Sequence, residues 1–124
     1  MTATTREQAP VAFKNDEAEL RTREMGGDFS VAFVRFAAGT DMAPAFQGLP
    51  DDLCPCPHWG YVLKGKVKLH NKDGSDQVYS AGEAFYWAPG HAPLAVEDCE
   101  YIDFSPTREF QEVVDHVSAA VAGK

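Results

Sequence analysis

The fold is decided by the stretch CPCPHWGYVLKG at residues 54–65. Its first half holds two thiols two residues apart, Cys54 and Cys56, and the imidazole of His58 follows two residues later. Its second half is rich in aromatic and branched apolar residues, which is typical of a β-strand. Transition metals favour thiol and imidazole ligands. The stretch therefore places metal-ligand candidates directly before a β-strand.

Strand patterns extend on both sides of this stretch. Residues 62–70 alternate between apolar and polar side chains, and residues 71–74 have the composition of a hairpin turn. Further short strands are predicted at residues 18–23, 29–36, 77–80, 84–88, 94–96 and 101–104. Short strands separated by Gly and Pro turns favour an all-β sandwich or barrel over alternating helices and strands.

The last part of the chain changes its period. Ser105 and Pro106 suit an N-cap and a first helical position. Apolar residues then recur at helical spacing, at Phe110, Val113, Val114, Val117 and Val121. We expect a single domain over residues 1–124, with a strand core at about residues 18–105 and one amphipathic helix at about residues 106–121.

The composition disfavours several classes of function. The formal net charge of -8 argues against a nucleic-acid partner, because phosphate binding needs clustered basic residues, and Lys64, Lys66 and Lys68 alternate as on a solvated strand face. No apolar run reaches the length of a membrane span, and the polar N-terminus does not suggest secretion. An odd count of three cysteines favours reduced thiols. We expect a cytoplasmic protein with no membrane partner.

Two segments, Tyr61–Val67 and Gly82–His91, resemble the two sequence motifs of the cupin superfamily. The resemblance covers about residues 29–104 and identifies the chain as a small single-domain cupin. It implies a cupin-type jelly-roll β-barrel with a C-terminal amphipathic helix. It also implies a divalent metal held inside the barrel by three His and one Glu, and a homodimer.

The metal ligands of the first cupin motif are all replaced in this chain. With Gly65 as the closing glycine of the motif, the Glu position holds His58, and the two His positions hold Cys54 and Asp52. All three replacements are able to bind a metal. The resemblance therefore implies an atypical site, in which His58 is the first candidate and Cys54 the leading sulfur ligand.

The second motif is altered in a similar way. Its His position holds Pro93, but His91 lies two residues earlier and faces the same side of an extended chain. Cys56 has the same parity as the first-motif candidates, although Pro55 and Pro57 disfavour a regular strand there. Burial of the thiols as small hydrophobic groups, and surface exposure of His91, are the alternative interpretations.

Aromatic residues near the two motifs are candidates for the wall of a pocket that binds a small organic molecule. They are Phe46, Trp59, Tyr61, Tyr86 and Trp87. Core packing is the alternative role for these side chains. Tyr86 and Asp103 are also candidates for proton transfer, with surface exposure as the alternative for Asp103.

Three functions remain open on these residues. The first is a metal-dependent enzyme of dioxygenase, isomerase or lyase type that acts on a small molecule, with Zn, Fe or Cu favoured over Mn by thiolate and imidazole ligands. The second is a metal-free cupin that binds a small ligand. The third is a thiol-based metal or redox sensor that uses Cys54 and Cys56.

Overall fold

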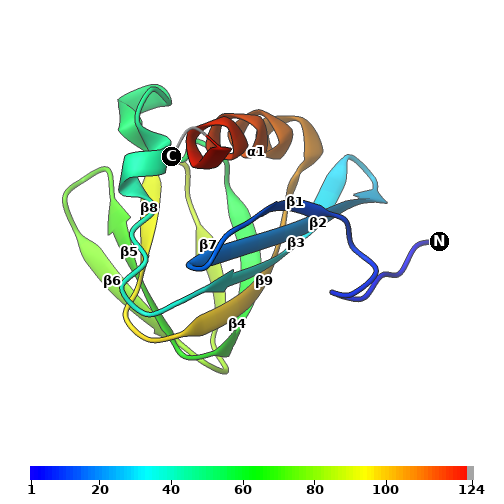
Figure 1. The fold of residues 1–124 in the computed structure, drawn as a ribbon, viewed down its shortest axis with the longest axis horizontal. Coiled ribbons are helices and arrows are strands. Elements are labelled where there is room, and N and C mark those ends of the chain that lie inside the picture. The colour runs from blue at the N-terminus through cyan, green and yellow to red at the C-terminus, as the bar shows by residue number, and fades with distance from the viewer. Residues whose placement is uncertain (123–124) are drawn as a thin grey trace.

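The computed structural model describes residues 1–122 and arranges their strands in two antiparallel sheets (Figure 1). The larger sheet has the strand order β1-β2-β3-β9-β4-β7, and the smaller has the order β6-β5-β8. The strands are β1 (Val11–Lys14), β2 (Ala18–Gly26), β3 (Phe29–Phe36), β4 (His58–Lys64), β5 (Lys66–Asn71), β6 (Asp76–Ser80), β7 (Ala84–Trp87), β8 (His91–Ala95) and β9 (Cys99–Pro106). This architecture confirms the all-β fold class expected from the sequence.

Alternation along β5 and β9 sets which of their side chains enter the space between the two sheets. In β9, Tyr101 and Asp103 are buried, while Phe104 is exposed on the outer face. Strand β5 buries Val67 and Leu69 in the same way. Each large apolar side chain that leaves water contributes about 1.5–3 kcal/mol to folding, so these inward rows hold the sheets together.

Strand β9 lies between β3 and β4 and forms the centre of the larger sheet. It pairs with β3 over its whole length and with β4 over most of that strand. Gly60 of β4 permits this close approach, because a Cβ at that position would collide with the backbone oxygen of Ile102 and the ring of Phe85. On its other edge β4 pairs with β7, which brings His58 opposite Trp87.

Helix α1 (Thr107–Ala122) lies across one end of the two sheets, next to the short 3-10 helix η1 (Ala43–Phe46) (Figure 1). Its buried residues are Phe110, Val113, Val114 and Val117. They belong to the apolar stripe identified in the sequence. The helix begins one residue later than expected, because Ser105 and Pro106 still belong to β9. No helix within residues 1–122 is long and apolar enough to cross a membrane.

The chain before β2 is tied to the outside of the larger sheet. Strand β1, which the sequence patterns did not indicate, pairs with β2. The Glu19 carboxylate is buried and forms ion pairs with Arg6, Lys14, Arg21 and Arg35. Arg6 precedes β1, so this pair fastens the N-terminal segment to the sheet.

Candidate metal centre

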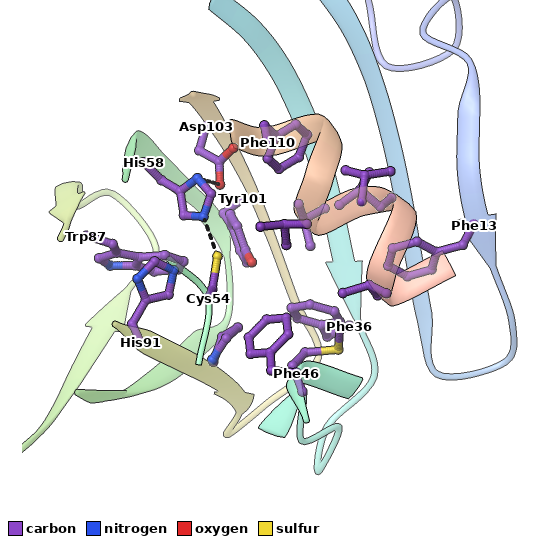
Figure 2. Close-up of a pocket in the computed structure, with 17 residues that line it drawn as sticks. Phe13, Phe36, Phe46, Cys54, His58, Trp87, His91, Tyr101, Asp103 and Phe110 are labelled. Carbon is purple, nitrogen blue, oxygen red and sulfur yellow. Dashed lines mark hydrogen bonds and ion pairs between the residues drawn. The ribbon is translucent and has the colours of Figure 1, made fainter. Parts of the chain in front are cut away.

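Three buried side chains that are able to bind a metal meet between the two sheets: Cys54, His58 and His91 (Figure 2). Each offers one ligand atom, and the three atoms all lie within 4.8 Å of one another. Cys54 Sγ and His58 Nε2 are 3.6 Å apart. A tetrahedral zinc ion, with Zn–S of about 2.3 Å and Zn–N of about 2.0 Å, holds such atoms roughly 3.5 Å apart. The cluster therefore has the dimensions of a metal site.

The three ligands come from two strand starts and the loop between η2 (Pro50–Asp52) and β4. His58 is the first residue of β4 and His91 is the first residue of β8. Cys54 lies in the loop, where its backbone N–H donates to the carbonyl of His91 over 2.8 Å and its carbonyl accepts from Gly90 N. These two backbone hydrogen bonds hold the thiol beside the imidazole of a residue that is distant in sequence.

Both imidazoles turn one ring nitrogen toward a fixed oxygen. His91 Nδ1 donates to the carbonyl oxygen of Ala88 over 2.6 Å. His58 Nδ1 is 2.6 Å from Ser105 Oγ, so its Nε2 is the nitrogen that faces Cys54. Histidines that bind metals usually donate the second ring N–H to such an oxygen, which fixes the tautomer and the ring orientation. Both histidines thus have the arrangement of Nε2 ligands.

Burial keeps the two imidazoles neutral. It lowers the pKa of His91 to about 4, and burial together with the neighbouring His91 lowers the pKa of His58 well below 6.5. The neutral imidazole is the form that binds a metal. Burial also raises the pKa of the Cys54 thiol to about 12, so this thiol stays protonated unless a cation displaces the proton.

A buried carboxyl group lies beside the cluster. Asp103 Oδ2 is 3.9 Å from His58 Nδ1, and burial raises the pKa of Asp103 to about 8. The structure thus buries this proton-transfer candidate, for which surface exposure was the alternative. Ser105, which the sequence patterns assigned to a helix cap, is the hydrogen-bond partner of His58 instead. The only sequence signal for that role was its shared parity with Asp103.

The other two metal-ligand candidates lie outside the cluster. Cys56 is buried, but its Sγ faces the carbonyl of Pro57 at 3.5 Å. Asp52 lies in η2 on the surface, where one of its carboxylate oxygens accepts a hydrogen bond from Gly48 N. A regular strand would have aligned these residues with Cys54 and His58, but the chain becomes a strand only at His58.

A cavity of about 50 Å³ adjoins the ligand cluster. Two of the five aromatic residues expected around a pocket, Phe46 and Trp87, line it. Trp59, Tyr61 and Tyr86 lie on the outer face of the larger sheet, where each is at least 43% exposed. Tyr86 is therefore remote from the ligand cluster that it was expected to serve.

Part of the remaining wall of the cavity comes from the C-terminal helix. Phe110, Val113, Val114 and Val117 cover it from α1, and Tyr101 and Asp103 contribute from β9. The helical periodicity of the apolar residues predicted that this face of α1 is buried. It carried no information on the segment against which the face packs, so the role of α1 as a wall of the site was not foreseen.

No protein-family model and no curated protein sequence matches the chain. Its fold, in contrast, is shared with many solved structures. An RmlC-like cupin from Shewanella frigidimarina NCIMB 400 is 19% identical, with a TM-score of 0.61 over 87% of this chain and 93% of that one. KdgF from Halomonas sp. is 24% identical, with a TM-score of 0.62 over 89% of this chain and 99% of that one.

A larger protein contains the same fold as one part. Oxalate decarboxylase from Bacillus subtilis, an enzyme with Mn(II) centres, is 15% identical, with a TM-score of 0.59 over 81% of this chain and 28% of that one. Identities this low show a shared arrangement of strands and leave the activity of this chain open.

Proposed function

This chain has the fold of a small cupin, and on that basis we propose that it binds one divalent transition metal through Cys54, His58 and His91. The single observation that carries the proposal is the meeting of these three buried ligands between the sheets. Buried thiol and imidazole groups with their second ring nitrogens already engaged match the needs of a metal site.

The donor set favours particular metals. One sulfur and two nitrogen ligands suit Zn, Fe or Cu better than Mn, which prefers oxygen ligands. Three protein ligands also leave a tetrahedral ion one open position, as in catalytic zinc sites. With such a position the metal would polarise a bound small molecule, as isomerase and lyase chemistry requires, or, if it is iron, would supply the oxygen chemistry of a dioxygenase.

The residues of the chain have separate roles in this proposal. Ser105 holds the His58 ring, Asp103 lies beside it, and the apolar face of α1 excludes bulk water from the site. Water exclusion strengthens every electrostatic interaction between the metal and a bound molecule. The proposed activity is therefore the binding and activation of a small molecule in a dry pocket.

The thiol-sensor alternative receives less support. Redox-sensing cysteines are accessible and have lowered pKa values. In contrast, Cys54, Cys56 and Cys99 are all buried, and burial raises the pKa of each thiol. The other alternative is a metal-free protein that binds a small ligand. Measurement of the metal content distinguishes it from the proposed metal-binding protein.

The test is the metal content of protein purified without a metal affinity column, before and after incubation with Zn²⁺ or Co²⁺. We expect about one equivalent of metal, and a sulfur-to-cobalt charge-transfer band in the Co²⁺ form. Single alanine variants of the proposed ligands should lose both signals. Matched controls are Cys99→Ala and His70→Ala, which alter a buried thiol and an exposed imidazole outside the cluster.

Two results would contradict the proposal. One is wild-type protein that stays far below one equivalent after incubation with either ion. The other is a set of ligand variants that retain as much metal as the two controls. Either result would turn attention to the cavity as a metal-free binding site.

A further inference from the structure

The cavity beside the proposed metal position limits the size of the molecule that reaches it. Its volume is about 50 Å³. A cavity of roughly 150 Å³ is what accommodates benzene in a protein core, and a single water molecule needs at least about 10 Å³ by the same measure. The cavity therefore suits a molecule larger than water and smaller than an aromatic ring.

The wall of the cavity also limits the charge of the bound molecule. None of its seventeen lining residues is Lys or Arg, so no side chain is available to pair with an anion. The thiolate of Cys54 would neutralise one of the two positive charges of a divalent metal. The Asp103 carboxyl group, also in the wall, adds a hydrogen-bonding group rather than a cation. An anion bound there would have no positively charged side chain as a partner, and its burial would carry a larger desolvation cost than the burial of a neutral molecule.

One atom of the wall indicates which polar group the molecule carries. Asp103 Oδ1 is buried and has no hydrogen-bond partner among the described residues. Figure 2 shows the Asp103 carboxyl group next to His58, with Phe110 nearby, and all three residues line the cavity. Native structures leave few buried polar atoms unpaired, and a missing ligand or water is one explanation for such an atom. A donor on the ligand would satisfy this oxygen.

We propose that the site binds a small neutral molecule with an oxygen that reaches the metal and an adjacent N–H or O–H group that donates to Asp103 Oδ1. This inference rests on the proposed function, because the metal is the second point of attachment. Small primary amides and alcohols have both groups within the available volume.

Three probes of matched size separate the parts of this proposal. Acetamide, acetone and acetate share a planar shape and the same number of non-hydrogen atoms. Acetamide carries the N–H donor, acetone lacks it, and acetate is an anion. We expect acetamide to change the visible spectrum of the Co²⁺ protein in a saturable way, with a dissociation constant on the order of 1 mM. Acetone should bind about tenfold more weakly, and acetate more weakly still.

Variants of Asp103 give a second readout. Asp103→Leu removes the acceptor and should abolish the preference for acetamide over acetone, whereas Asp103→Asn keeps an oxygen and should retain it. Cobalt stoichiometry is measured for each variant, so a failure of the metal site is seen separately. Three results with cobalt-loaded protein would overturn the inference. They are a preference for acetate, equal binding of acetamide and acetone, and no binding of any probe up to about 100 mM, which is about a hundredfold above the expected dissociation constant.

Discussion

Replacement of Phe110 by alanine should enlarge the cavity enough to admit an aromatic ligand. The Phe110 ring is buried, lines the cavity and lies 5.9 Å from the His58 ring between centroids. Removal of a phenyl group frees roughly 100 Å³ if the surroundings do not collapse. Added to the present 50 Å³, this reaches roughly the 150 Å³ that holds benzene.

The same substitution should cost stability. Loss of a buried Phe side chain destabilises a protein by about 3–5 kcal/mol, from lost burial and from the cavity that remains. A domain of this size has a free energy of unfolding of about 5–15 kcal/mol, so most of the variant molecules should still fold. Phe110→Leu opens less volume and is the milder second variant. Phe104→Ala removes an exposed ring from the outer face and should cost less than about 1 kcal/mol.

The assay combines urea unfolding with titration of the Co²⁺ proteins with benzamide. We expect benzamide to leave the wild-type and Phe104→Ala spectra unchanged and to change the Phe110→Ala spectrum in a saturable way. Its binding should also recover part of the lost stability by mass action. A folded, cobalt-loaded Phe110→Ala protein that still excludes benzamide would refute the assignment of Phe110 as the residue that limits ligand size.

Three further predictions concern the sheet, the ligands and the response to acid. Gly60→Ala should lower the free energy of unfolding by about 1–3 kcal/mol, because the added Cβ collides with neighbouring backbone. An unchanged free energy in urea unfolding would contradict the close packing of β4 at this position. Ser105→Ala should weaken metal affinity about 10- to 100-fold, because the His58 ring loses its hydrogen-bond partner. A competition titration with a chelator measures the affinity, and an unchanged value would contradict the role of Ser105 in orienting His58. Burial raises the pKa of Glu19, but Arg6 and the neighbouring arginines outweigh burial, so the pKa is lowered from 4.5 overall. The ion pairs of Glu19 therefore stabilise the fold above pH 4.5, and this stability is lost as the pH falls through the lowered pKa. Arg6→Ala should therefore be less stable than wild type at pH 7 and lose less stability on acidification to pH 3, and parallel stability curves would contradict this.

The inward and outward faces of β4 show where sequence reasoning reached its limit. One parity of this strand carries Trp59 and Tyr61, and the other carries His58, Gly60 and Val62. Hydrophobicity favoured the aromatic parity as the wall of a pocket. The structure turns that parity outward and buries His58 and Val62, and a Cβ on Gly60 would collide with its neighbours. Alternation defines two faces, but the neighbouring strands decide which face is buried.

The sequence indicated the kinds of ligand in the candidate site better than it indicated which residues come together there. Cys54 and His58 were recognised because they occupy ligand positions of the first cupin motif, and His91 because it lies near one of the second. The structure joins Cys54, in the loop before β4, to His91 of β8 by backbone hydrogen bonds. It also separates Cys56 and Asp52 from them. Spacing along the chain did not distinguish these two outcomes, because the prolines between the candidates break the strand geometry.

The sequence by itself determined the alternating strands, the glycine turns, the period of the C-terminal helix and the kinds of ligand available, because each of these depends on the chain within a few residues. Only the tertiary structure decided which candidate ligands meet, that Asp103 is buried beside His58, and that α1 lines the cavity. Those outcomes depend on register and packing between segments far apart in the chain, where a shift of one residue exchanges the buried face of a strand for the exposed one.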